Sequence, residues 1–161
     1  MRIQRHGCSA SRLLHSPGSK HLSPQDSEET IVKRIGVAIV ESAGCFLVGL
    51  RAPGTVLAGL SEFPGGKCES DETPQACAVR ECLEETGLAV IPQMQLGTVP
   101  WDYPHGSVEL HFWLCSLAHD LPPGLAPAAP FRWVPASELS QLTFPPANQQ
   151  VLQLLQQRVQ Q

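Results

Sequence analysis

Residues 66–88 of this chain read GKCESDETPQACAVRECLEETGL. The second half of this stretch has the boundary signals of a helix. Thr73 is a good N-cap, Pro74 suits the first helical position, and Gly87 suits the position that ends a helix. We therefore predict one helix that starts at residue 74 and stops at this glycine.

The predicted helix gathers acidic side chains. Because successive residues step by about 100° around a helix, Glu81, Glu84 and Glu85 share one side. Like charges held together cost free energy unless a cation lies among them. Carboxylate ligands without a nearby histidine suit Mg²⁺ or Mn²⁺ better than Zn²⁺. The pattern predicts a divalent-metal site, and such a site favours phosphate chemistry.

The opposite side of the helix carries Ala76, Val79 and Leu83, which we expect to pack into the core. Glutamates at this spacing more often form a solvated face, so their spacing alone decides little. Two neighbouring features favour the metal site. The glycine-rich turn at residues 63–67 lets backbone approach a ligand closely, and Arg80 can hold a glutamate through a two-point ion pair.

The rest of the chain mixes strands and helices without a regular alternation. Residues 108–117 alternate, with apolar side chains at 108, 110, 112 and 114 on one face. A closing helix is expected after residue 148, with an apolar stripe at Val151, Leu152, Leu155 and Val159. Strands are predicted at residues 34–40, 45–50, 93–99, 108–117 and 131–134. The expected fold class is α+β, a mixed sheet flanked by helices.

Bulk composition excludes several classes of function. The 161 residues suit one domain, and the net charge of −4 comes without a basic stripe, so broad binding to duplex nucleic acid is not expected. No apolar run approaches the roughly 20 residues that cross a membrane. The six cysteines form no CxxC pair, and we interpret them as reduced thiols of a cytoplasmic protein.

The first thirty residues differ from the remainder. They are rich in serine, histidine and arginine, and the first acidic residue is Asp26. We expect residues 1–30 to form a disordered tail and residues 31–161 to form the domain. A mitochondrial targeting peptide is the alternative, because such peptides are rich in arginine and poor in acids.

The segment from Gly66 to Leu88 resembles the Nudix box of the Nudix hydrolase superfamily. Every charged and glycine position of that signature is filled, and Cys82 stands where the family prefers Ile, Leu or Val. The resemblance implies the Nudix fold, a mixed β-sheet sandwiched between α-helices. It also implies Mg²⁺- or Mn²⁺-dependent hydrolysis of a nucleoside diphosphate linked to another group. The metal ligands that it implies are Glu81, Glu84, Glu85 and the Gly65 carbonyl, with Arg80 orienting the glutamates.

Other segments resemble the MutT-like branch, the 8-oxo-dGTP diphosphatases. These segments are EFPGGK at residues 62–67, the aromatic strand at 110–114 and FPPAN at 144–148. In that branch the asparagine reads the purine edge, which gives Asn148 this role; an N-cap of the last helix is the alternative. The same resemblance gives Arg51 a phosphate-binding role, with Lys67 assisting, although Arg51 could be only a surface residue.

One departure from the MutT pattern concerns the residue that deprotonates water. MutT-like enzymes often carry a glutamate shortly before the late tryptophan, whereas residues 126–133 here contain no acid. The base is then expected among the box glutamates, or turnover is slow. We predict a nucleoside triphosphate diphosphatase that converts 8-oxo-dGTP, or a related purine nucleotide, to the monophosphate and pyrophosphate. The alternatives are a CTP-type pyrimidine nucleotide diphosphatase and a catalytically weak domain that recognises nucleotides.

Overall fold

The computed structural model describes residues 32–104, 106–121 and 125–159, and for residue 159 the backbone alone. The tail or targeting peptide predicted at residues 1–30 lies outside this range. No helix within the described residues is long and apolar enough to cross a membrane. In chain order, the elements are β1 (Lys33–Ser42), β2 (Cys45–Leu50), β3 (Ser61–Glu62), β4 (Gly65–Lys67), α1 (Pro74–Thr86), β5 (Val90–Tyr103), β6 (Gly106–Leu117), β7 (Arg132–Pro135), the 3₁₀ helices η1 (Ala136–Gln141) and η2 (Pro146–Asn148), and α2 (Gln149–Val159).

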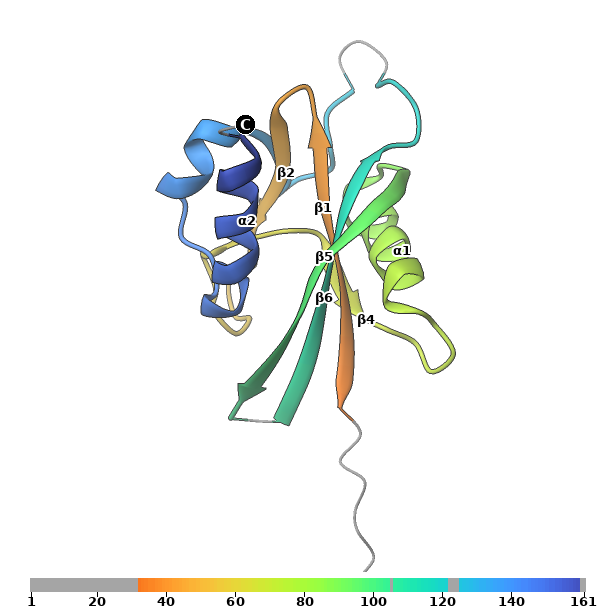
Figure 1. Cartoon of the computed structure of the whole chain (residues 1–161), viewed down its shortest axis with the longest axis vertical. Coiled ribbons are helices and arrows are strands. Elements are labelled where there is room, and N and C mark those ends of the chain that lie inside the picture. Colours follow the sequence, from red (N-terminus) through yellow and green to blue (C-terminus); the bar gives the residue numbers. More distant parts are fainter. Residues whose placement is uncertain (1–31, 105, 122–124, 160–161) are drawn as a thin grey trace, which may run out of the picture. The chain divides into compact units, whose positions relative to one another are not determined.

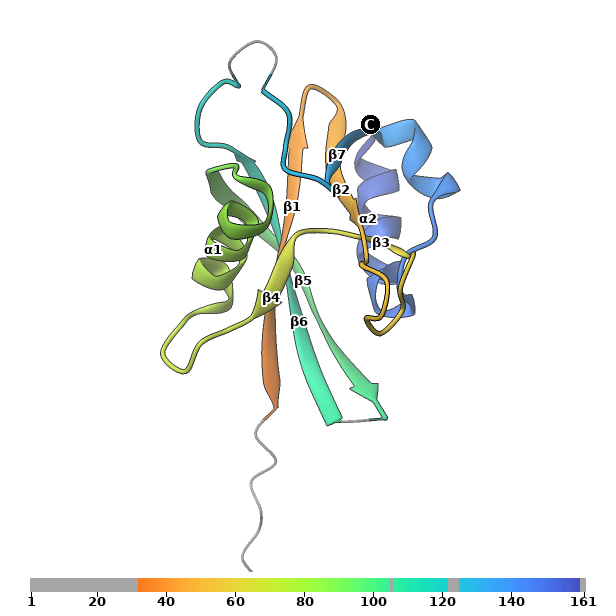
Figure 2. The same cartoon turned by 180° about the vertical axis from the view of Figure 1, so that it is seen from behind.

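The strands form one mixed sheet in the order β3-β2-β1-β6-β5, with β4 added to β1 and β7 added to β2. β1 and β6 run parallel, with Val37 opposite Phe112, and the other pairs are antiparallel. Helix α1 covers one face of the sheet and α2 the other (Figure 1), and the view from behind agrees (Figure 2). The predicted class, a mixed sheet sandwiched between helices, is confirmed.

The sheet separates two hydrophobic cores because alternate residues of a strand point to opposite faces. On β1, Val37 and Ile39 join the core under α2, whereas Ala38 and Val40 join the core under α1. The predicted burial of the apolar face of β6 is confirmed at Leu110, Phe112 and Leu114. In α2, Val151 and Leu155 are buried and Leu152 packs against the same core; the side chain of Val159 lies outside the described residues.

Two differences from the predicted strands bear on the site. The strand predicted at 93–99 extends over Val90–Tyr103, with register shifts that interrupt its alternation. The glycine-rich turn contains the short strand β4, which pairs with β1 through Gly65 and Val37. A strand of three residues has almost no periodicity of its own, so only the distant partner β1 defines it.

The predicted core face of α1 is confirmed at Val79, which packs against the core under this helix, and is wrong at Ala76 and Leu83. Leu83 is 50% exposed and Ala76 is exposed, whereas the buried residues are Cys77, Ala78, Cys82 and Thr86. The physical reason is the close approach of α1 to β1. A Cβ at Gly36 would collide with the backbone oxygen of Pro74, so only small side chains fit between helix and sheet. The glutamates therefore flank the buried face instead of opposing it.

Candidate active site

Arg80 organises the acidic cluster of α1. Its Nε lies 2.7 Å from Glu72 Oε1 and its Nη2 lies 2.8 Å from Glu72 Oε2, which makes the expected two-point ion pair. Its Nη1 donates to Glu81 Oε1 at 2.8 Å and to Glu84 Oε2 at 3.1 Å. Nη2 also donates to the carbonyl of Lys67 at 3.2 Å. One guanidinium thus links the loop before α1, the end of β4 and two of the predicted metal ligands.

The electrostatics of Glu72 follow from this contact. Hydrogen bonds from Arg80, and next the backbone N–H of Glu69, lower the pKa of the Glu72 carboxyl to about 2. The same ion pair raises the pKa of Arg80 above its ordinary value. Glu72 therefore stays charged throughout the physiological range and serves as an anchor for the arginine.

Glu85 lies at the opposite end of the cluster, against the glycine-rich turn. Its Oε2 accepts a hydrogen bond of 3.0 Å from the backbone N–H of Gly65. Partial burial of this carboxyl raises its pKa to about 7, and the negative charges of Glu62, Glu81 and Glu84 add to the increase. The residue as a whole is exposed, but its carboxyl group contacts the backbone of the turn. The crowding of like charges that the sequence predicted is therefore present.

Gly66 explains how the turn and the helix come so close. A Cβ at this position would collide with the carboxyl group of Glu81. The absence of a side chain lets the backbone of β4 pass directly beside the glutamates. The donors gathered here are carboxylate oxygens beside a backbone segment, with no thiol or imidazole among the predicted ligands. This set fits a hard divalent cation.

A pocket of about 450 Å³ opens beside these glycines. Its cationic side chains are Lys33, Arg51 and Lys67, so the two predicted phosphate-binding residues do line one cavity. The other residues that line the pocket are mostly apolar: Ile35, Val56, Leu57, Gly65, Gly66, Tyr103, Pro104, Gly106, Val108 and Leu110. A cavity with apolar walls and a few charged groups is typical of a small-molecule site.

Arg51 is held in place by two contacts. Its Nη1 lies 3.1 Å from Glu62 Oε2, and its Nε donates to the carbonyl of Val56 at 2.9 Å. The first contact ties it to β3 and the second shapes the loop after β2. Arg51 is thus part of the pocket and not an isolated surface residue.

Sequence reasoning missed Glu62, Lys33 and the loop residues Val56 and Leu57. Burial raises the pKa of Glu62, whose charge in turn contributes to the raised pKa of Glu85. The one sequence signal for Glu62 was its position immediately before the Phe-Pro-Gly-Gly turn. Nothing in the local sequence marks the other three, because strand pairing and loop conformation bring them to the pocket.

Asn148, the predicted base-recognition residue, is buried at the end of η2. It is not among the residues that line the pocket of Lys33, Arg51 and Lys67. Its segment nevertheless lies beside the glycine-rich turn, because Phe144 stacks on Phe63 with ring centroids 4.9 Å apart. The purine-reading role of Asn148 stays a prediction.

Comparison with known proteins identifies the family. The family model of the NUDIX domain matches residues 35–154. This chain belongs to the NUDIX domain family. It is 34% identical over 102 residues to the 8-oxo-dGTP diphosphatase of Escherichia coli (strain K12), covering 63% of this chain and 78% of that protein. It is also 34% identical over 76 residues to the CTP pyrophosphohydrolase of the same organism, covering 47% and 56% of the two chains.

Solved structures give the same result. The solution structure of the MutT protein from methicillin-resistant Staphylococcus aureus 252, a Nudix hydrolase, superposes with a TM-score of 0.62 at 27% identity. The match covers 79% of this chain and 97% of that one. The resemblance to MutT-like Nudix hydrolases, the Nudix fold and the assignment as an enzyme are thereby confirmed. Nudix hydrolases generally use a divalent metal.

Proposed function

We propose that this Nudix hydrolase converts 8-oxo-dGTP, or a related purine nucleoside triphosphate, to the monophosphate and pyrophosphate with Mg²⁺. The observation that carries the proposal is one juxtaposition. Glu85 and Glu81 of α1 reach Gly65 and Gly66, and the same glycines line the pocket that holds three cationic side chains. Relatives named as 8-oxo-dGTP diphosphatases support this choice of substrate.

In this proposal Glu81, Glu84, Glu85 and the Gly65 carbonyl would hold the Mg²⁺. The ion would neutralise the charge of the diphosphate and polarise the phosphorus toward attack by water. Arg80 orients two of these glutamates through its contacts of 2.8 and 3.1 Å. It is therefore a positioning residue, and its own orientation depends on Glu72.

The cationic residues of the pocket bind the polyphosphate. Lys33, Arg51 and Lys67 line it together, and Glu62 presents the Arg51 guanidinium in a fixed direction. The apolar wall, which includes Leu57 and Tyr103, excludes water from the nucleoside end of the substrate. An Asn148 amide would supply both a donor and an acceptor to the purine edge.

A glutamate of the site accepts the proton of the attacking water, because residues 126–133 carry no acid. Burial raises the pKa of Glu62, a carboxyl of the site that is not among the proposed Mg²⁺ ligands. A raised pKa makes a carboxylate a better proton acceptor near neutral pH.

The test is a nucleotide panel with the pure protein and Mg²⁺. Orthophosphate and pyrophosphate are followed separately, because pyrophosphate release identifies attack that yields the monophosphate. We expect the highest kcat/KM for 8-oxo-dGTP or another purine triphosphate. A clear preference for pyrimidine nucleotides, with release of pyrophosphate, would overturn the purine assignment.

The second candidate is a pyrimidine nucleotide diphosphatase. Its support is the similarity to a CTP pyrophosphohydrolase at the same identity as to the 8-oxo-dGTP diphosphatase, although over fewer residues. The same panel separates the two candidates, since CTP would then outcompete every purine. Nucleotide binding without turnover of any substrate would instead favour a recognition module.

A further inference from the structure

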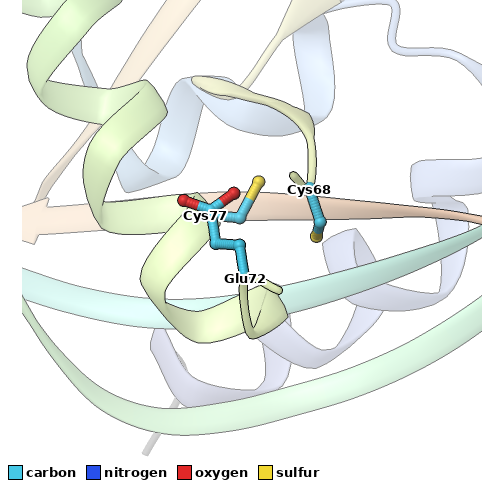
Figure 3. A group of neighbouring side chains, drawn as sticks. All are labelled: Cys68, Glu72 and Cys77. Atoms are coloured by element: carbon cyan, nitrogen blue, oxygen red, sulfur yellow. The ribbon is translucent and has the colours of Figure 1, made fainter. Parts of the chain in front are cut away.

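A second group of potential metal ligands lies beside Arg80. Cys68, Glu72 and Cys77 each offer one ligand atom, and these atoms all lie within 4.8 Å of one another (Figure 3). Cys68 comes from the loop after β4, Glu72 from the residue before the N-cap of α1, and Cys77 from the first turns of that helix. The cluster therefore joins the two ends of the loop that leads from β4 into α1.

The chemistry of these ligands differs from that of the glutamate site. Two thiol sulfurs and one carboxylate are the donors of a thiophilic cation, whereas the predicted Mg²⁺ ligands are oxygens throughout. A tetrahedral Zn²⁺ with Zn–S distances of about 2.3 Å requires its sulfurs to be about 3.8 Å apart. The observed separations of 4.8 Å or less are within a small side-chain rotation of this geometry.

One neighbouring charge favours a bound thiolate, whereas the burial of Cys77 opposes it. Arg80 Nη2 donates to Cys77 Sγ at 3.7 Å, so a permanent positive charge already faces this sulfur. The oxygens of Glu72 accept three hydrogen bonds, two from Arg80 and one from the Glu69 N–H. Because a carboxylate has about four lone-pair sites, one remains for a cation without breaking the ion pair.

We propose that Cys68, Glu72 and Cys77 form a second metal site, which takes a thiophilic divalent cation such as Zn²⁺ and leaves its fourth position to water. Both thiols lose their protons to solvent when the cation binds. Binding therefore strengthens as the pH rises. The site is independent of which nucleotide the enzyme hydrolyses.

Binding at this second site inhibits the Mg²⁺-dependent reaction. Cys77 Sγ donates to the carbonyl of Gly66 at 3.3 Å, and deprotonation removes this bond beside the glutamates. Coordination to the cation also withdraws negative charge from the Glu72 carboxylate, which weakens but does not break its ion pair with Arg80. Two contacts that shape the catalytic site are thereby weakened together.

Co²⁺ tests the site directly, because thiolate ligation gives an intense near-ultraviolet charge-transfer band that carboxylate ligation does not give. The reduced, full-length protein is titrated with Co²⁺ in saturating Mg²⁺, so that the glutamates are already occupied. We expect a band that saturates at one Co²⁺ per chain and is abolished by excess Zn²⁺. C68A and C77A should lack it, and C45A, which removes another half-buried thiol on β2, should retain it.

Cys68 is half-buried in a loop, so C68A should fold and turn over substrate as the wild type does while resisting inhibition by low Zn²⁺. A wild type without the band, or a band that persists in both C68A and C77A, would overturn the proposal. So would loss of the band in C45A. If peroxide removes two thiols from the wild type but none from C68A, while Co²⁺ gives no band, the pair is a redox disulfide and not a metal site.

Discussion

Arg80 forms a bidentate ion pair with Glu72, with Nε 2.7 Å from Oε1 and Nη2 2.8 Å from Oε2. The remaining nitrogen, Nη1, contacts Glu81 and Glu84. A glutamate that precedes the helix therefore determines where the helix glutamates point, by way of one planar guanidinium. This arrangement gives Arg80 a role that a lysine cannot fill.

Replacing Arg80 by lysine should lower kcat/KM roughly 10- to 100-fold, the usual cost of losing a group that orients metal ligands. A lysine keeps the charge but cannot bridge Glu72, Glu81 and Glu84 at once. The Mg²⁺ concentration that gives half-maximal rate should rise. Arg132→Lys, an exposed site on β7, is the control and should change neither quantity.

Glu85→Gln should reduce the rate at least about 10²-fold, because the variant loses a metal-binding or proton-accepting carboxylate. The amide can still accept the hydrogen bond from the Gly65 N–H, so the turn should keep its conformation. Initial rates with saturating Mg²⁺ measure the effect, and the exposed Glu41→Gln on β1 is the control. A rate equal to that of wild type would refute the assignment.

The raised pKa of Glu85 makes the stability of the metal-free protein depend on pH. Its pKa of about 7 lies above the ordinary 4.5, so the stability that this group contributes is fully present below pH 4.5 and is lost as the pH rises through 7. In EDTA, the difference in Tm between Glu85→Gln and the wild type should therefore shift in favour of the variant as the pH rises from 4.5 through 7. Saturating Mg²⁺ should remove the gain, because a bound cation favours the charged carboxylate.

Gly66→Ala should lower activity about 10- to 100-fold with little change in Tm. The added Cβ collides with the carboxyl end of Glu81, which is flexible enough to move aside but then leaves its position in the site. Gly97→Ala is the matched control, since a Cβ at that glycine of β5 meets nothing within 4 Å. A variant with unchanged kinetics and metal dependence would show that the position of Glu81 is not critical.

Asn148→Ala should reduce discrimination between 8-oxo-dGTP and dGTP more than it reduces overall turnover. Loss of an amide that pairs with the purine edge removes binding energy that only the preferred base obtains. The ratio of kcat/KM for the two nucleotides is the measurement, with the exposed Gln149→Ala as control. Equal losses on both substrates would assign Asn148 a structural role.

Local sequence was sufficient for the elements with clear periodicity or boundary signals. The helix predicted from Thr73, Pro74 and Gly87 is α1, in which Thr73 Oγ1 accepts from the Ala76 N–H and Gly87 adopts a φ of 74°. The alternating pattern of β6 and the apolar stripe of α2 also predicted which of their residues are buried. These features depend on residues within a few positions of each other, where spacing and conformation are directly linked.

The sequence by itself determined the family, the helix that carries the glutamates and the oxygen-rich character of their site, because all three reside in one continuous motif. Only the tertiary structure decided which side of that helix is buried, since the missing side chain of Gly36 sets how closely α1 approaches β1. It also decided that Lys33, Arg51 and Lys67 share a pocket and that Cys68, Glu72 and Cys77 converge. Such contacts arise from strand pairing and packing between distant segments, which no local spacing encodes.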